Sequence, residues 1–387
     1  MGDNVKPLKV LHIGADNVGY GGRSVIAFNL TQSMDEKVVI NDFLVFHEVE
    51  DKYVKALKRK KGKYVTILIN NKKIKLFNEI ERTYQLCSEI KKNKYDIIHI
   101  HADDAYEAIK SVWIAKLAGI KYFVIHAHTT GSNEKYTFLK RVLIKFCQSQ
   151  ITRYKVCQLA CSIEAARYLF GKRNKKEIHI IKNGINTQLF YYDTIVRQNT
   201  RKKLGYKKEQ VVIGNIGRFV PSKNHIFLLD IFEKVLEFIP SARLLLIGNG
   251  NLKNMIEDIA KEKGIYQFID FLGNRADVPQ LLQAMDIFVL PSFFEGFGIV
   301  NLEAQCSGLP CIVSDKIPKS VYITDMITFL PLGETAELWA NAICNAAYQE
   351  NRRDYRNEII SAGFDINESA LVLQNYYKTI KQDGNIR

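Results

Sequence analysis

Residues 286–315, DIFVLPSFFEGFGIVNLEAQCSGLPCIVSD, decide the fold of this 387-residue chain. The stretch opens on an apolar run at 287–290 and ends on a second one at 311–313, and both are typical of buried strands. The loop 295–298 between them is too rich in glycine to lie inside a helix, whereas the segment from Ile299 has the pattern of a short helix. The sequence therefore predicts a strand, a glycine loop, a helix and a strand, which is a unit of a parallel α/β sheet.

The glycine loop has the composition of an anion site. Gly296 and Gly298 let a phosphate approach the backbone at a helix N-terminus, where unpaired amides carry a partial positive charge. Glu295 and Glu303 flank this site and would repel a phosphate, so they are better explained as acceptors for the hydroxyls of a sugar and a ribose. Together these features describe a nucleotide sugar. Spacing alone leaves open that both glutamates are solvent-facing charges on an ordinary βαβ unit.

The motif EGFGIVNLE, preceded by LPS and followed by AQCSGLPCIVSD, resembles the E-x7-E signature of the retaining family 4 (group 1) glycosyltransferases. The resemblance covers nearly the whole chain and is closest to bacterial exopolysaccharide, capsule or O-antigen enzymes. It implies the GT-B fold, an α/β architecture of two Rossmann-like, doubly wound domains that face a central cleft. The implied domains are 1–187 for the acceptor, 188–366 for the nucleotide-sugar donor, and 367–387 as a helix that returns to the first domain.

A second motif, GRFVPSKNH, begins at Gly217 directly after a predicted strand. Gly217 provides a tight turn, and Arg218 and Lys223 would converge on one place, as a guanidinium and an ammonium do around a diphosphate. The resemblance implies that both residues grip the leaving diphosphate. The alternative from the residues alone is two surface charges on a βα loop.

The resemblance also implies roles for the remaining donor-site residues. Glu295 would hold the donor sugar, Glu303 the ribose hydroxyls, and the loop at Asn274 and Arg275 would lie by the nucleotide base. The residues assigned in this way to donor binding are Glu303, Gly296, Phe297, Gly298, Ile299, Asn274, Arg275 and Gly217.

Two strands of the first half end in histidines, in YDIIHIH and YFVIHAH. His128 follows the second of them at the carboxyl edge where ligands bind in doubly wound sheets, and the resemblance implies that it meets the donor sugar as a catalytic residue. A packed core histidine is the alternative. His99 and His101 have a spacing that suits a metal, but the sequence shows no third ligand, so packed strand-end histidines are the favoured interpretation.

The loop ADNVGYGGRSV follows the first strand and carries Gly19, Gly21 and Gly22. Ser24 stands where a dinucleotide fingerprint needs its third glycine, and this disfavours a nicotinamide oxidoreductase. The resemblance makes Gly21 and Gly22 candidates for the loop that borders the diphosphate and the acceptor, while a plain surface loop is the alternative.

Basic residues are concentrated in the first half. Residues 1–200 hold 34 Lys and Arg against 19 Asp and Glu, whereas residues 201–387 hold 21 against 22. No nucleic-acid-binding motif accompanies this charge, which suits an anionic membrane or a polyprenyl-diphosphate-linked acceptor better than nucleic acid. Within 136–156 the apolar residues share one helical stripe flanked by lysine and arginine, a pattern that favours peripheral membrane contact. Ordinary core contact is the alternative.

The composition predicts an enzyme that needs no metal or other cofactor. No two aspartates are separated by a single residue, so the Asp-x-Asp motif of metal-dependent glycosyltransferases is absent. The seven cysteines are scattered and are expected to be reduced thiols. No secretory signal or membrane-spanning run is evident, so we expect a cytoplasmic protein, with a possible place on the inner face of the membrane.

Two local expectations concern the connections. The charged segment 51–75 around the apolar run 64–69 is expected to form a hairpin, and residues 185–200 to form an irregular linker between the domains.

The function expected from these motifs is transfer of a sugar from a nucleoside diphosphate sugar, with UDP the expected nucleotide from family frequency, to a glycan or lipid-linked acceptor. A nucleotide-sugar epimerase of the same architecture, and a catalytically silent membrane-associated scaffold for polysaccharide assembly, are the rival hypotheses.

Overall fold

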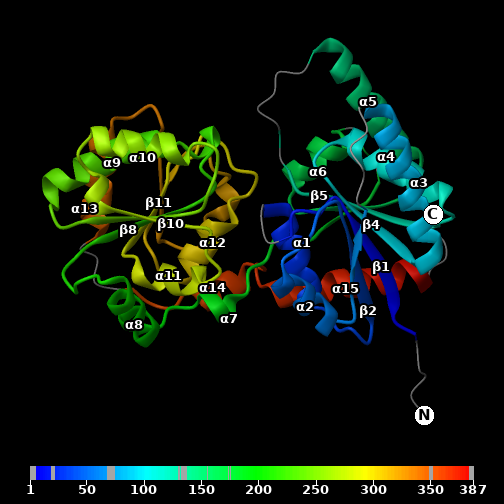
Figure 1. Ribbon diagram of the computed structural model, residues 1–387, viewed down its shortest axis with the longest axis horizontal. Helices are drawn as coiled ribbons and strands as arrows, with labels where there is room; N and C mark the ends of the chain where they lie inside the picture. Colours follow the sequence, from blue (N-terminus) through cyan, green and yellow to red (C-terminus); the bar gives the residue numbers. More distant parts are fainter. Residues whose placement is uncertain are drawn as a thin grey trace. The chain divides into compact units, whose positions relative to one another are not determined.

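The computed structural model describes residues 6–18, 22–67, 75–129, 131, 137–154, 156–172, 174, 176–347 and 352–382. The chain divides into two compact units (Figure 1). The first unit comprises Met1–Gly184 and Ile366–Arg387, and the second comprises Ile185–Asp365. The C-terminal helix thus belongs to the first unit, and the observed divisions fall one to three residues before the expected ones.

The first unit contains a seven-stranded parallel sheet in the order β3-β2-β1-β4-β5-β6-β7. Its strands are β1 Leu8–Ile13, β2 Val39–Val45, β3 Tyr64–Thr66, β4 Ile97–Ala102, β5 Tyr122–Ala127, β6 Val156–Ala160 and β7 Ile178–Ile180. Its helices are α1 Gly22–Gln32, α2 Asp51–Arg59, α3 Lys75–Asn93, α4 Ala105–Leu117, α5 Phe138–Arg153, α6 Ile163–Phe170 and α15 Ile366–Gln382.

The two faces of this first sheet differ in chemistry. Ile98 and Ile100 of β4 pack with α3 to α6 in a large apolar core, because alternate residues of a strand point to the same face. His99 and His101 alternate with them and point to the other face, which α1, α2 and α15 cover (Figure 1). A sheet buried on both faces explains why its strands are mostly apolar, with the histidines and Asn41, Asp42 and Gln158 among their few buried polar residues.

The second unit contains a six-stranded parallel sheet in the order β10-β9-β8-β11-β12-β13. Its strands are β8 Val212–Ile216, β9 Arg243–Ile247, β10 Ile269–Gly273, β11 Ile287–Leu290, β12 Cys311–Ser314 and β13 Ile327–Leu330. Its α-helices are α7 Thr187–Phe190, α8 Thr194–Leu204, α9 His225–Phe238, α10 Lys253–Glu262, α11 Val278–Ala284, α12 Ile299–Cys306, α13 Ala336–Ala347 and α14 Arg356–Ser361. Its 3-10 turns are η1 Pro221–Lys223, η2 Tyr266–Phe268 and η3 Lys319–Val321.

Strand β11 shows why the second sheet is buried on both sides. Ile287 and Val289 pack with α9, α10 and α13, whereas Phe288 and Leu290 pack with α7, α11, α12 and α14. The strand order reverses between β8 and β11, and the corresponding reversal in the first sheet lies between β1 and β4. Ligands of doubly wound sheets bind outside the carboxyl ends of the strands at such points.

Both expectations for the connections are wrong. The segment expected as a hairpin forms α2 and then β3, which pairs in parallel with β2, and residues 68–74 lie outside the described residues. Residues 185–200 are not an irregular linker, because they hold α7 and most of α8. Asp193 caps α8 by accepting hydrogen bonds from the amides of Ile195 and Val196, so a polar stretch is here a helix start. No helix in the described part of the chain has the length and apolar content that crossing a membrane requires.

Candidate active site

The loop that follows β11 holds Glu295 in place through buried hydrogen bonds. Oε1 of Glu295 accepts one from Oγ of Ser292 at 2.8 Å, and Oγ of Ser314 donates to the backbone carbonyl of Ser292 at 2.7 Å. Ser292 and Ser314 are fully buried, and only 8% of Glu295 is exposed. The carboxylate is therefore anchored to the ends of β11 and β12.

Lys223 pairs directly with Glu295. The Nζ of Lys223 lies 2.5 Å from Oε1 of Glu295, and both side chains are largely buried. The amide of Phe293 donates to the carbonyl of Ser222 at 2.8 Å, so the loops after β8 and β11 are also joined through their backbones. Lys223, which is expected to bind the diphosphate, and Glu295, which is expected to bind the sugar, thus form an ion pair at the ends of neighbouring strands.

Gly298 and Asn301 shape the start of α12. Gly298 has a φ of 76°, and a Cβ built on it would lie 2.7 Å from Nδ2 of Asn301. Asn301 is fully buried, and its Nδ2 donates to the carbonyl of Gly298 at 3.0 Å. A side chain at position 298 would strain the backbone and clash, so the close approach requires glycine.

Glu303 lies half-buried on α12, and burial raises the pKa of its carboxyl to about 8. The structure shows no hydrogen bond or ion pair of this carboxyl with any residue that it describes. A neutral carboxyl has one donor and remaining acceptor capacity, so it can bind a pair of hydroxyls without repelling a nearby phosphate.

Arg218 is exposed directly after β8, where the backbone is tightly constrained. The amide of Phe219 donates to the carbonyl of Asn249 at 3.0 Å. A Cβ on Gly248 would lie only 2.0 Å from the carbonyl oxygen of Gly217. Among the described residues the guanidinium of Arg218 has no hydrogen-bond or ion-pair partner, which leaves it available to a ligand anion.

Four more of the predicted donor residues lie in the described part of the second unit. Phe297 is buried and packs against Phe364, so only its backbone groups can meet a ligand, and Ile299 is partly buried against the same core. Arg275 and Asn274 are exposed after β10, and the guanidinium of Arg275 forms a bidentate pair with Asp277 at 2.6 and 2.7 Å. The role of the last two stays a prediction.

The candidates of the first unit are divided between described and undescribed residues. His128 is buried after β5, and its Nε2 lies 2.8 Å from Nδ1 of His101. Gly22 is exposed as the first residue of α1, and a Cβ there would meet nothing within 4 Å. Gly21 lies outside the described residues.

Sequence reasoning missed several residues of this arrangement. Ser292, Ser314 and Asn301 were missed because a hydroxyl or an amide in a loop has no distinctive spacing. His12 was missed as a neighbour of His101, although KVLHIG places a histidine on a strand like the other two motifs. That repeated pattern was the available signal.

A separate cavity of about 680 Å³ lies at the opposite edge of the second sheet. Asp286 and Pro310, which line it, directly precede β11 and β12, so the cavity is at the amino ends of these strands. It contains none of the predicted site residues.

The constellation at the carboxyl edge has a consistent chemistry. Arg218 and Lys223 follow β8, Glu295 follows the neighbouring strand β11, and Glu303 stands on the helix that begins at the glycine loop. Cations and loop amides suit a diphosphate, and the carboxyls suit hydroxyls.

Comparisons with known proteins identify the family. Residues 196–363 match the model of the glycosyl transferases group 1, and residues 47–189 match that of glycosyltransferase family 4. A curated relative named "Putative glycosyltransferase EpsF", from Bacillus subtilis (strain 168), is 28% identical over 97% of both chains. An Escherichia coli UDP-Gal:alpha-D-GlcNAc-diphosphoundecaprenol alpha-1,3-galactosyltransferase is 30% identical over 65% of both chains.

Solved structures show the same fold. Anabaena Alr3699/HepE, solved in complex with UDP and glucose, aligns with a TM-score of 0.76 at 17% identity, over 96% of this chain and all of the other. WaaG, a glycosyltransferase involved in lipopolysaccharide biosynthesis, aligns with a TM-score of 0.71 at 17% identity, over 95% of this chain and 99% of the other. Both family models, one for each part of the chain, and the two-sheet fold therefore establish that this protein is a GT-B glycosyltransferase of the family 4, group 1 type.

Proposed function

We propose that this enzyme is a retaining glycosyltransferase of bacterial surface polysaccharide synthesis. It transfers a sugar from a UDP-sugar to a hydroxyl of a glycan or a polyprenyl-diphosphate-linked acceptor. The observation that carries the proposal is the set of residues that follow β8 and β11: Arg218, which has no partner among the described residues, the Lys223–Glu295 pair, and Glu303 on the helix that begins at the glycine loop.

The departing diphosphate is the main charge that such a reaction must stabilise. Arg218 offers a planar guanidinium with five N–H donors, and Lys223 offers an ammonium. The amides of 296–298 add partial positive charge from the backbone. Because Lys223 is paired with Glu295, a phosphate has to share or take over this ammonium. The loss of one such group typically lowers turnover by about 10² to 10³.

The hydroxyl-binding groups are assigned by their surroundings. Glu303 would hold the ribose hydroxyls through its half-buried carboxyl, and Glu295 would hold the donor sugar. By resemblance, His128 would contact the donor sugar. By resemblance no protein nucleophile is needed, because a leaving phosphate oxygen can accept the proton of the acceptor hydroxyl.

Two similar proteins support the substrate class. The name of the E. coli relative specifies a UDP-sugar donor and an acceptor on a diphosphoundecaprenol carrier. The Anabaena protein, which shares the fold, was solved with UDP and glucose bound. A lipid-linked acceptor also agrees with the basic first half of the chain.

Helix α5 supports a membrane-bound acceptor. Its apolar residues Phe138 and Leu139 are 79% and 78% exposed, and Val142, Leu143 and Phe146 are about half exposed, so the stripe is not part of the core of the described chain. Lys140, Arg141 and Lys145 are exposed beside it. An apolar stripe with a basic flank is the pattern of a helix that lies in a bilayer interface.

Thermal unfolding with UDP, GDP, ADP and CMP, for wild type and Glu303→Ala, tests the donor assignment. A ligand present at about 100 times its dissociation constant stabilises a protein by about 2.7 kcal/mol. UDP should raise the melting temperature of wild type by several degrees and should not shift the mutant. A shift by GDP alone would contradict the UDP assignment.

Turnover of UDP-sugars, with product analysis, tests the reaction. Arg218→Ala should lower kcat by about 10² to 10³, and the anomeric configuration of the product should match that of the donor. Undiminished turnover by Arg218→Ala would refute its role. Conversion of the sugar without an acceptor would mean an epimerase, and no turnover with intact nucleotide binding would favour the scaffold.

A further inference from the structure

Five buried histidines share one face of the first sheet. They are His12 on β1, His99 and His101 on β4, His126 on β5, and His128 directly after β5. The strand register places His12 opposite His99 and His101 opposite His126. Only His128 has a role in the proposed function.

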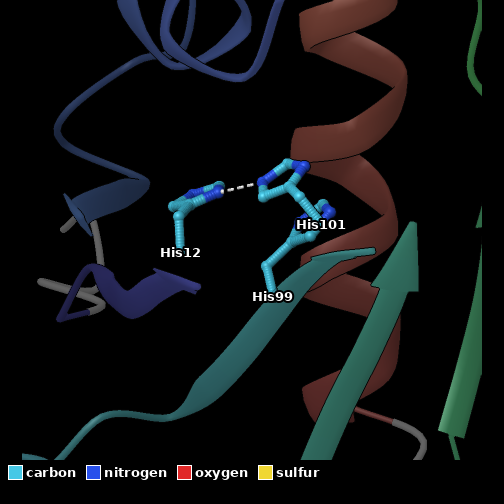
Figure 2. A group of neighbouring side chains, drawn as sticks. All are labelled: His12, His99 and His101. Carbon is cyan, nitrogen blue, oxygen red and sulfur yellow. Dashed lines mark hydrogen bonds between the residues drawn. The ribbon is translucent and has the colours of Figure 1, made fainter. Parts of the chain in front are cut away.

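Three of these histidines form a hydrogen-bonded chain that begins at Asn41. Oδ1 of Asn41 lies 2.9 Å from Nε2 of His12, and Nδ1 of His12 lies 2.9 Å from Nε2 of His101. Nδ1 of His101 in turn lies 2.8 Å from Nε2 of His128. Figure 2 shows the rings of His12 and His101 pointing toward one another across the first of the two contacts between rings.

Each ring of this chain carries a single proton at neutral pH. Burial lowers the pKa of His12 to about 4. Burial and then the neighbouring histidines lower the pKa of His101, and burial, His126 and Arg23 lower that of His128. A neutral imidazole has one N–H and one bare nitrogen, so each ring can donate one hydrogen bond and accept one.

The amide of Asn41 sets the direction of the whole chain. Its Nδ2 faces the thioether sulfur of Met34 at 3.5 Å, and since a thioether can only accept, the amide oxygen faces His12. His12 must then donate from Nε2, which leaves its Nδ1 bare to accept from Nε2 of His101. By the same step, Nδ1 of His101 accepts from Nε2 of His128.

This order leaves Nδ1 of His128 as a bare nitrogen. The atom is buried and has no hydrogen-bond partner among the described residues. A buried polar atom without a partner is costly and calls for a group that completes it. We propose that Asn41, His12 and His101 are positioning residues that hold His128 as the Nε2–H tautomer, so that its Nδ1 accepts a hydrogen bond from a hydroxyl of the donor sugar. The substrate half of this proposal rests on the proposed function.

A metal ion fits these residues less well. Three imidazoles bind Zn²⁺ when their bare nitrogens converge at about 2.0–2.1 Å from it. The rings of His99 and His101 are stacked, with centroids 4.3 Å apart and planes inclined by 10°, so one ion cannot lie in both ring planes. His12 and His101 also use both ring nitrogens in the chain.

Nitrogen-15 NMR of the histidine rings tests the tautomer without any turnover. In wild type we expect His128 to carry its proton on Nε2, with a bare Nδ1. Asn41→Leu removes the acceptor that directs the chain, so His128 should become a mixture of tautomers. His126→Phe is the matched control, because His126 is buried on the same face and its ring nitrogens have no hydrogen-bond partner among the described residues.

Steady-state kinetics tests the link to the sugar. Asn41→Leu should lower kcat/KM for the nucleotide sugar by about three- to tenfold, the effect of one neutral hydrogen bond, and the control His126→Phe should leave it near the wild-type value. In a His128→Ala background the same Asn41 change should have no further effect, because the group that it positions is gone.

The outcomes separate the two proposals. A proton on Nδ1 of His128 in wild type, or a tautomer that Asn41→Leu leaves unchanged, overturns the relay whatever the enzyme transfers. So does one equivalent of Zn²⁺ that stays bound after dialysis and is lost in His12→Phe. If His128 has the expected tautomer but its NMR signals do not change with any nucleotide sugar that the enzyme turns over, the sugar contact is overturned. If the enzyme turns over no nucleotide sugar, the result counts against the proposed function instead.

Discussion

The Lys223–Glu295 pair is the residue-scale feature that governs the candidate site. The two residues are 72 positions apart in the chain, yet their charged atoms meet at 2.5 Å beside the buried hydroxyl of Ser292. The buried carboxylate of Glu295 therefore needs the charge of Lys223 for the protein to be stable. This structural role is separate from the expected role of each residue in binding a ligand.

Lys223→Met should destabilise the protein by about 1.5–3 kcal/mol, the worth of a hydrogen bond to a charged group, because it leaves a buried carboxylate without its cation. Urea unfolding measures this loss, and Glu295→Gln in the same chain should recover part of it. The exposed pair Lys261–Asp258 is the control, since Lys261→Met should have little effect. If Lys223→Met and Lys261→Met lose equal amounts of stability, the buried pair does not have this structural role.

Glu303 makes the stability of the ligand-free protein depend on pH. Its folded pKa of about 8 lies above the ordinary value of 4.5, so between these values the unfolded chain is ionised while the folded protein keeps the proton. The contribution of Glu303 to the free energy of unfolding is thus greatest below pH 4.5. It falls as the pH rises to about 8, by at most about 1.4 kcal/mol per pH unit.

Glu303→Gln removes this slope. The variant should match wild type near pH 4.5 and exceed it in stability near pH 8, which urea unfolding at several pH values will show. Glu337→Gln on α13 offers a control that should keep the wild-type slope. A wild-type slope in Glu303→Gln would mean that its carboxyl is not protonated in the folded protein.

At the scale of elements, the contact between the loops after β8 and β9 positions Arg218. Gly248 has a φ of 139°, and its Cα approaches the carbonyl of Gly217 so closely that no Cβ fits. Gly248→Ala should move the β8 loop and lower kcat by about tenfold or more. Gly264→Ala shares a positive φ of 68° but has open space, so it should lose stability without losing kcat at assay temperature. If steady-state kinetics show the same change in kcat for both variants, the loop contact does not have this role.

Helix α5 is the element for which membrane contact is predicted. Wild-type protein should co-sediment with anionic liposomes at low salt, and less so at high salt, because each basic residue near such a surface contributes about 1 kcal/mol. Leu139→Ser with Val142→Ser and Phe146→Ser should abolish the binding. Leu117→Ser on α4, where the side chain is also exposed, is the control. Failure of wild type to bind would end the membrane proposal.

At the scale of the whole molecule, the reaction is predicted to need no divalent metal. The Asp-x-Asp motif is absent from the sequence, and Arg218, Lys223 and the loop amides supply the positive charge for the diphosphate. We expect turnover to be unchanged by excess EDTA in a standard assay. If chelation stops turnover and Mn²⁺ or Mg²⁺ restores it, the diphosphate charge is met by a metal instead.

The regular elements were predictable because their signal is local. The motif at 286–315 predicted β11, α12 and β12 within a residue, since apolar runs, glycines and prolines fix a strand or a helix through neighbouring residues alone. The predictions for segments 51–75 and 185–200 were wrong because charged and polar residues suit a hairpin, a linker or a helix surface. Only packing against β2 or within the second unit decides between these.

The sequence by itself determined the family and the two parallel sheets and predicted the candidate site residues, because those inferences depend on short motifs and on alternation along a strand. Only the tertiary structure decided what each side chain meets. The ion pair of Lys223 with Glu295, the packing of Phe297 in the core and the chain from Asn41 to His128 all join residues from separate strands and loops. Burial then set the pKa of Glu303 and of the histidines, because a group's solvation depends on everything folded around it.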